Sequence, residues 1–333
     1  MPLVSCTVPC NLCGNQSAER IGSTDRDGQP LRTVLCQMCG LVWTDPRPDT
    51  NQNRKFYSED YRLQYKSTYV PKRKHVYRET LRAIARYQAI SRLVQPEMRL
   101  LDVGSGAGFF PYVAQSQGID AQGIEPNRGF AEYAVATFDV PTTNSFFQDV
   151  EFPSESFDIV TLNHVLEHVE DPCATLRQLR DWLKADGYLV VEVPNVEATY
   201  HAPKNRFHVG HLYNFNPVNL KHLGGKAGLE VHASKLVTGA DHIHLTFQKG
   251  PSAIVKDKDE DFAIPGNYNR VSSILNRHTT LRHFGSTVPY TRFLNKQSQY
   301  FTERRAVNGD ASPRQIADEQ IATHLNPPAQ YAA

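Results

Sequence analysis

Apolar residues in the middle of the chain fall into short runs, separated by longer segments with helical spacing. Short apolar runs bounded by turn residues predict β-strands. Five such runs lie at residues 99–104, 121–125, 157–163, 188–194 and 242–248. Strands that alternate with helices are typical of an α/β sheet with largely parallel strands. We therefore expect residues 96–250 to form one α/β domain with helices on both faces of the sheet.

Two helix starts in this domain carry explicit signals. Asp171–Pro172 and Asn216–Pro217 each place a capping side chain before a proline, and proline favours the first helical turn. We expect the first helix to end near Leu183. The second should end at Gly228, since glycine commonly follows the last helical residue.

The segments that flank the α/β domain are more polar. Residues 49–95 settle into a helix-like linker or cap, in which five apolar side chains share one face: Val76, Leu81, Ile84, Ala85 and Leu93. Residues 251–333 predict two or three helices and a disordered tail at 326–333. Six apolar residues of this extension could pack on the core, cover the active site or pair two subunits as a homodimer: Val271, Ile274, Leu275, Phe293, Leu294 and Phe301.

Composition narrows the classes of partner. The chain has 36 Lys and Arg against 35 Asp and Glu, a net charge of +1, whereas nucleic-acid-binding domains are usually clearly basic. No apolar run approaches the roughly 18 residues that span a bilayer, and the N-terminus lacks a signal sequence. We therefore expect a cytoplasmic protein with a small-molecule partner, and neither a membrane nor a nucleic acid.

Five of the six cysteines fall within the first 39 residues. The pattern Cys-x-x-Cys-Gly occurs twice, with 22 residues between the second cysteine and the third. Two residues between cysteines allow one tight turn to supply two thiolate ligands, and four thiolates close the coordination shell of a structural zinc ion. We therefore predict a zinc ribbon at residues 1–48, with Cys6 as an incidental thiol. Its zinc ligands are Cys10, Cys13, Cys36 and Cys39.

A glycine-rich turn follows the first predicted strand of the α/β domain. Gly104, Gly106 and Gly108 have the spacing GxGxG, and Phe109 stands where a dinucleotide fingerprint needs its third glycine. A dehydrogenase or a purely structural turn are the alternatives. Glycines at this place let the backbone turn sharply and approach a ligand closely.

Two acidic residues distinguish the ligand of this turn. Asp102, expected inside the turn, suits the ammonium group of a methionine moiety and would repel a pyrophosphate. Glu125 ends the second strand, where a carboxylate can accept hydrogen bonds from both ribose hydroxyls. These features favour S-adenosylmethionine as the cofactor.

Several segments together resemble the class I (Rossmann-like) methyltransferases of glycan and natural-product pathways: LDVGSGAGFF, GIEPN, FPSESFDIVTLNHVLEHVEDP and HLYNFNP. The N-terminal CNLCG…CQMCGLVWTDPRP is similar to the zinc-ribbon leader common in that group. The resemblance covers residues 10 to about 248. It implies a biosynthetic enzyme that uses S-adenosylmethionine. The residues expected at the cofactor are Asp102, Gly104, Ser105, Gly106, Glu125, Gln148 and Asp149 near the adenine, and Asn163 and His164 at the methionine end.

Methyl transfer to a hydroxyl needs correct orientation and a base that removes a proton. His164, Glu167 and His168 follow the fourth strand of the domain. This stretch resembles one that can hold a divalent metal in ubiquinone-pathway O-methyltransferases, although His164 replaces an acid; capping of the next helix is the simpler role for Glu167. His242 and His244 share one face of the last strand, where we expect core or edge histidines.

The second cluster, FHVGHLYNF at residues 207–215, follows the fifth strand. It is similar in layout to the Tyr-His-Glu-His segment of zinc-containing deoxysugar C-methyltransferases, with Phe207 and Gly210 in place of the tyrosine and glutamate. We expect His211 to be the general base, with His208 in reserve and His164 as a third candidate. The alternative is that His211 only shapes the pocket.

The leading hypothesis is a methyltransferase acting on a hydroxyl of a sugar, sugar nucleotide or natural-product intermediate. C-methylation of a ketosugar is one alternative. An RNA or protein methyltransferase that docks its substrate on the zinc ribbon is another, and a non-catalytic binding module is a third. The near-neutral charge argues against RNA, and the intact glycine turn with both acids argues against the binding module.

Overall fold

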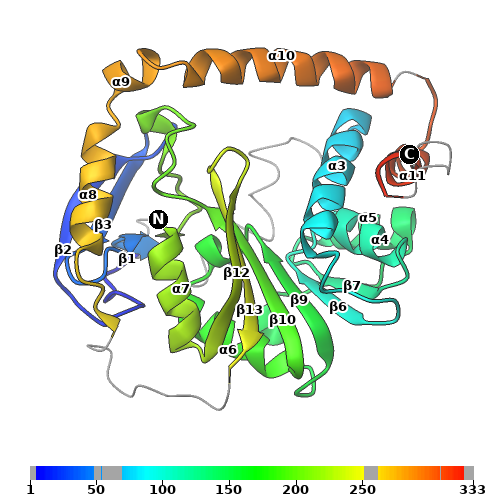
Figure 1. Ribbon diagram of the computed structural model, residues 1–333, viewed down its shortest axis with the longest axis horizontal. Coiled ribbons are helices and arrows are strands. Elements are labelled where there is room, and N and C mark those ends of the chain that lie inside the picture. Colours follow the sequence, from blue (N-terminus) through cyan, green and yellow to red (C-terminus); the bar gives the residue numbers. More distant parts are fainter. Residues whose placement is uncertain (1–4, 49–53, 55–69, 251–261, 308, 326–333) are drawn as a thin grey trace. The chain divides into compact units, whose positions relative to one another are not determined.

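The computed structural model describes residues 5–48, 54, 70–250, 262–307 and 309–325 (Figure 1). The predicted disordered tail, much of the segment at 49–69 and the side chain of Cys6 lie outside the described part. Contacts divide the chain into two compact units. One combines Met1–Asn53 with Leu162–Phe293, and the other combines Arg54–Thr161 with Leu294–Ala333.

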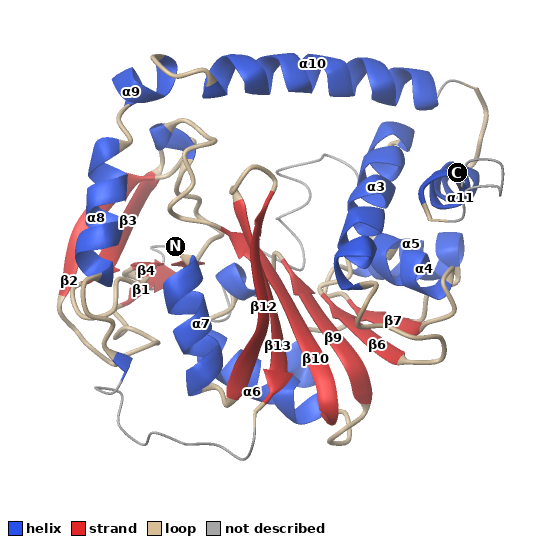
Figure 2. Ribbon diagram, in the orientation of Figure 1, coloured by secondary structure: helices blue, strands red, loops and turns tan. Residues whose placement is uncertain are grey.

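A seven-stranded sheet is the main structural element (Figure 2). Its order is β12-β13-β10-β9-β6-β7-β8. The strands are β6 (Arg99–Val103), β7 (Asp120–Ile124), β8 (Thr142–Thr143), β9 (Phe157–Asn163), β10 (Leu183–Pro194), β12 (Leu229–Val237) and β13 (His242–Lys249). Strands β6, β7 and β8 are parallel, whereas β13 runs antiparallel to β10 and to β12. The predicted α/β sheet flanked by helices is confirmed.

All five predicted strands are present, and β9 has the predicted bounds. Strands β8 and β12 were not predicted. The first is only two residues long, and seven consecutive residues of β12 are exposed, so neither has a continuous apolar run. Strand β10 begins five residues earlier than predicted, because its first part includes the polar residues Lys184 and Asp186.

In the unit that contains β6 to β8, helices α3 (Arg73–Ile90) and α4 (Phe109–Gln115) pack on each other, and α11 (Pro313–His324) packs on α3. Helix α5 (Arg128–Phe138) contacts β8. The predicted apolar face of α3 is wrong in part, because Ala85 is exposed and Ala83 is buried instead. Val76 and Ile84 are buried as expected.

The other unit holds a second sheet, ordered β11-β4-β3-β2, and a separate pair of β1 (Ser5–Cys6) with β5 (Arg47–Pro48). Strands β2 (Ala18–Thr24), β3 (Pro30–Cys36) and β4 (Val42–Thr44) come from the N-terminal segment. Strand β11 (Tyr213–Asn214) comes from the loop after β10 and pairs with β4. The N-terminal sheet is therefore completed by a strand almost 170 residues further along the chain.

Both predicted helix caps are confirmed. Asp171 accepts a hydrogen bond from the backbone N–H of Ala174 at the start of α6 (Pro172–Trp182). Asn216 and Asn219 form a reciprocal capping box at the start of α7 (Pro217–Lys226), and Gly228 follows the helix with φ 79°.

The C-terminal extension contributes α8 (Asn267–Arg277), α9 (Thr280–Phe284) and α10 (Val288–Ala306) in addition to α11. Val271 of α8 packs with Leu35, Val42 and Val196 in a buried cluster. In contrast, Phe293, Leu294 and Phe301 of α10 are each at least 60% exposed. Helix α8 therefore packs on the core, whereas these three residues of α10 do not. Within the described residues, none of the helices combines the length and the apolar character needed to cross a bilayer.

Candidate functional site

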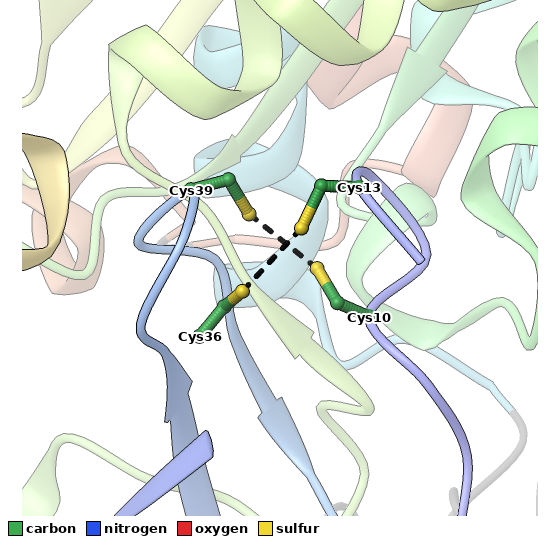
Figure 3. Close-up of side chains that lie close together, drawn as sticks. All are labelled: Cys10, Cys13, Cys36 and Cys39. Carbon is green, nitrogen blue, oxygen red and sulfur yellow. Dashed lines mark hydrogen bonds between the residues drawn. The ribbon is translucent and has the colours of Figure 1, made fainter. Parts of the chain in front are cut away.

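The four predicted zinc ligands come together in one buried cluster (Figure 3). Their sulfur atoms point toward a common centre, with Cys10 Sγ 3.4 Å from Cys39 Sγ and Cys13 Sγ 3.5 Å from Cys36 Sγ. Four sulfurs at 2.3 Å from a tetrahedral zinc ion would be about 3.8 Å apart, so the cluster is close to the size that zinc requires. The residues present fit a structural zinc ion.

Local and distant residues hold the cysteine turns in place. Gly40, directly after the fourth cysteine, has φ 71°, and a Cβ there would lie 2.7 Å from the Asn267 side chain. Asn267 donates a hydrogen bond to the carbonyl oxygen of Cys39, and Asn219 donates one to that of Gly40. Asn216 in turn donates to Asn267. This buried amide network connects one cysteine turn to the N-termini of α7 and α8.

The glycine turn joins β6 to α4 as predicted. Gly104, Gly106 and Gly108 all have positive φ, at 74°, 56° and 79°, which glycine adopts without steric cost. Gly106 donates its backbone N–H to Oε2 of Glu125 at 2.8 Å, and Asn127 donates to Oε1 at 2.9 Å. The carboxylate of Glu125 therefore lies against the glycine turn, where it can accept hydrogen bonds.

Asp102 differs from its predicted place. It belongs to strand β6, two residues before Gly104, and it is only 4% exposed. Its carboxylate accepts a hydrogen bond of 2.5 Å from the hydroxyl of Thr161. The side chain of Ser105 lies against Gly123 of β7, where an added Cβ would overlap with its Oγ. The absence of a side chain at Gly123 is thus what allows the turn to sit on the sheet.

The other predicted cofactor residues have the following positions. Gln148 and Asp149 are exposed in a 3₁₀ turn, η2 (Phe147–Asp149), and Asp149 forms a 2.6 Å ion pair with Arg54. Asn163 is the half-buried last residue of β9. His164 follows it with φ 55°, an unfavourable conformation for a residue with a side chain.

Eight histidine and glutamate side chains lie close together in the unit that contains β10 and β13: His164, Glu167, His168, Glu192, His208, His211, His242 and His244. The carboxylate of Glu167 is buried, and its Oε1 lies 3.4 Å from Nδ1 of His164 and 3.7 Å from Nε2 of His168. Burial by itself would raise the pKa of Glu167, but His168 and His164 lower it to about 2. Glu167 is therefore an anion beside two histidines, whereas the cap of the following helix α6 is Asp171.

The loop between β10 and α7 brings both predicted bases to this cluster. The ring of His211 lies 4.9 Å from that of His168 and 5.1 Å from that of His208. His208 accepts the backbone N–H of Gly210 on its Nδ1, and Nδ1 of His168 donates to the carbonyl oxygen of Gly210. The lone pair of a neutral His208 is thus used inside the loop, which favours His211 as the residue that accepts a proton.

His211 does not have the pKa of an ordinary histidine. Burial, and then the charge of His168, hold its pKa well below the ordinary value of 6.5. Burial lowers the pKa of His208 to about 4. Both imidazoles are therefore neutral at physiological pH, a state in which they accept protons or bind metal ions.

Glu192 of β10 was missed by sequence analysis, and His242 and His244 were placed in the core or at an edge. His244 is buried, whereas the side chain of His242 is 24% exposed. Nε2 of His164 lies 3.1 Å from Oε1 of Glu192, and the rings of His164 and His242 are 4.6 Å apart. For Glu192, His242 and His244, the only signal in the sequence was the alternation of the two histidines along β13.

Parts of the chain are similar to known methyltransferases. Residues 73–234 match the model of a methyltransferase domain. A search of curated protein sequences found no match. Among solved structures, the chain is similar to 1,6-didemethyltoxoflavin-N1-methyltransferase from Burkholderia thailandensis, with 16% identity and a TM-score of 0.46 over 71% of this chain and 100% of that one. An S-adenosylmethionine-dependent methyltransferase from Archaeoglobus fulgidus gives 19% identity and a TM-score of 0.45 over 57% of this chain and 100% of that one.

Proposed function

We propose that this chain is an S-adenosylmethionine-dependent methyltransferase that methylates a hydroxyl of a small molecule: a sugar, a sugar nucleotide or a natural-product intermediate. The match of residues 73–234 to a methyltransferase domain supports this proposal. The observation that carries the proposal is the glycine turn of residues 104–108, with the carboxylate of Glu125 lying against it. In this proposal Glu125 binds the ribose hydroxyls of S-adenosylmethionine, and Asp102 and Asn163 contact its methionine end. Gln148 and Asp149 contact its adenine.

The chemistry demands little beyond orientation and one proton transfer. The sulfonium charge falls as the methyl group moves, so the protein mainly holds the nucleophile, the methyl carbon and the sulfur in line. The proposed base is His211, which is neutral and therefore ready to accept the hydroxyl proton. The anionic Glu167 lies in the same cluster and raises the proton affinity of His211, so it would stabilise the imidazolium that forms.

We propose in addition that the cysteine cluster holds a structural zinc ion. Its four buried sulfurs, the two Cys-x-x-Cys-Gly turns and the amide network on the carbonyl groups of Cys39 and Gly40 support this assignment. Four thiolates leave no open coordination position, so the ion contributes to folding and not to methyl transfer. Homodimer formation through the C-terminal extension stays a prediction.

The cofactor assignment is tested by Glu125→Ala. Removing the carboxylate takes away the acceptor of two ribose hydroxyls. Hydrogen bonds to a charged group contribute about 1.5–3 kcal/mol each. We expect S-adenosylmethionine to bind at least about 100-fold more weakly by titration calorimetry.

The matched control for this variant is Glu132→Ala, which removes an exposed glutamate paired with Arg128 on α5. It should bind the cofactor as tightly as the natural sequence. Since Glu125 also accepts two backbone N–H groups, the thermal unfolding of each variant is measured as well. Unchanged cofactor affinity in a folded Glu125→Ala protein contradicts the assignment.

The pH dependence of turnover tests the base. A general base works in its deprotonated form, so activity is lost as the pH falls through its pKa. Burial and then His168 lower the pKa of His211, with smaller effects from Glu167, His208 and His164. We therefore expect kcat to stay level from pH 8 down to 6.5 and to fall only below that value. Half-maximal kcat at pH 6.5 would indicate a histidine with an ordinary pKa and would exclude His211 in this environment.

A further inference from the structure

Three side chains from adjacent strands converge near the end of β10. His164 directly follows β9, Glu192 lies on β10, and His242 begins β13. One ligand atom from each of the three lies within 4.8 Å of the others. Three ligand atoms this close together can bind one metal ion.

The sheet fixes this convergence. Glu192 pairs with His244 and Pro194 pairs with His242 across β10 and β13, so alternate residues of both strands face the same side. The backbone N–H of His164 donates to the carbonyl oxygen of Glu192 at 2.8 Å. His164 has φ 55°, and unfavourable backbone conformations of this kind cluster at functional sites.

We propose that His164, Glu192 and His242 bind a divalent transition-metal ion, separate from the cysteine site. Two imidazoles and one carboxylate are a common ligand set for such ions. Three protein ligands leave coordination positions open, as in catalytic metal sites. Those positions would take an oxygen atom of water or of a hydroxyl-bearing substrate.

Neighbouring residues orient the proposed ligands. Nδ1 of His164 faces the carboxylate of Glu167 at 3.4 Å, which leaves Nε2 directed toward Glu192. A metal-binding histidine typically donates its other ring N–H to a carboxylate or a carbonyl group in this way. Nδ1 of the buried His244 lies 3.6 Å from Oε2 of Glu192 and supports that carboxylate from the other side.

A second group in the same unit, Glu167 with His168 and His211, also has ligand atoms within 4.8 Å of one another. Two observations favour the first group. The side chains of His164 and His242 are 32% and 24% exposed, which gives an ion access, whereas that of His168 is 14% exposed. Glu167 is moreover already the carboxylate partner of His164.

The role of the ion rests on the proposed function, although its binding does not. A bound divalent ion lowers the pKa of an oxygen ligand and would make an acceptor hydroxyl easier to deprotonate. In that case the ion and His211 act on the same proton.

The test uses Mn²⁺ alone with the full-length chain, in the absence of cofactor and acceptor. Carboxylate and imidazole ligands accept Mn²⁺, whereas thiolates select softer ions, so the cysteine cluster does not contribute. Binding is followed by the loss of the electron paramagnetic resonance signal of free Mn²⁺. We expect one ion per chain, and an affinity at least about 100-fold lower in Glu192→Gln and in His242→Ala, because each removes a direct ligand.

His168→Ala and His211→Ala are the matched controls, and both should keep their Mn²⁺ affinity. Thermal unfolding of all four variants shows that they are folded; Glu192→Gln preserves the shape of its side chain and His242 is partly exposed, so at least one informative variant remains. Two results overturn the proposal: a natural sequence that binds no Mn²⁺, or binding that is lost in His168→Ala and kept in His242→Ala. Since no methyl transfer is measured, failure of the proposed enzymatic activity leaves this result unaffected.

Discussion

His211→Ala should lower turnover by about 10²–10⁴-fold, which is the usual contribution of a general base. The loss of turnover should come from the missing imidazole and not from a change in the fold of the loop. The backbone N–H of His211 donates to the carbonyl oxygen of His208, and its own carbonyl oxygen accepts from the hydroxyl of Thr44. An alanine keeps both bonds, so the loop should persist while the imidazole is lost. Turnover is measured at saturating cofactor and acceptor.

Two further variants test whether the loss of turnover is specific to His211. His222→Ala removes an exposed histidine that bonds to its own helix, and it should leave turnover unchanged. His208→Ala should mainly lower thermal stability, because it removes the acceptor of the Gly210 N–H. Cofactor affinity should stay nearly constant in all three variants.

If His211→Ala and His208→Ala both keep most of their activity, the loop acts only as a cover. The base would then be sought at His164 or His168, or catalysis would rest on orientation alone. If His211→Ala instead loses both its activity and its folded state, the role of the ring is structural. The ring of His211 would then support the fold by packing between those of His168 and His208.

Cys36→Ser should release the zinc ion and unfold the N-terminal sheet. Structural zinc contributes an apparent binding free energy of about 10–16 kcal/mol to folding, which is as large as the whole stability of a typical domain. Cys36 ends β3, the strand between β2 and β4, so loss of the ion should disorder the strands on both sides. Hydrogen exchange at residues 10–44 reports that loss, and elemental analysis counts the metal.

The zinc count is made in a Glu192→Gln background, which restricts it to the cysteine site. The value should be about one per chain and close to zero after Cys36→Ser. Cys173→Ser is the control, because Cys173 is a buried cysteine on α6 that is not part of the cluster. An equal loss of zinc in Cys173→Ser, or a redox-active iron in the cluster, would contradict the assignment.

The features that sequence predicted correctly are local ones. Gly104 to Gly108 form the predicted turn because glycine tolerates positive φ, wherever the rest of the chain lies. Asp171 and Asn216 start helices because a capping side chain bonds to a backbone N–H only three residues away. Each pair of cysteines is likewise held within one turn by two intervening residues. Contacts over two to four residues are fixed by chain connectivity, so the sequence by itself determined them.

The features that the sequence analysis missed depend on pairing between strands that are far apart in the chain. Glu192, His164 and His242 are 28 to 78 residues apart, and the register of β10 with β13 brings them together. A slip of one residue would turn the side chains to the other face of the sheet, so no local pattern can place them. Strand β11 joins the N-terminal sheet for the same reason.

Burial was also decided only by the tertiary structure. The sequence identified His211 as a candidate base but could not show how its pKa differs from that of an ordinary histidine. Its environment lowers that pKa, because removing a charge from water costs free energy and His168 repels it. The sequence therefore determined which chemical groups the protein carries and where its turns and helices begin. The tertiary structure determined which of those groups share a site and in which protonation state, because both depend on what the folded chain excludes from water.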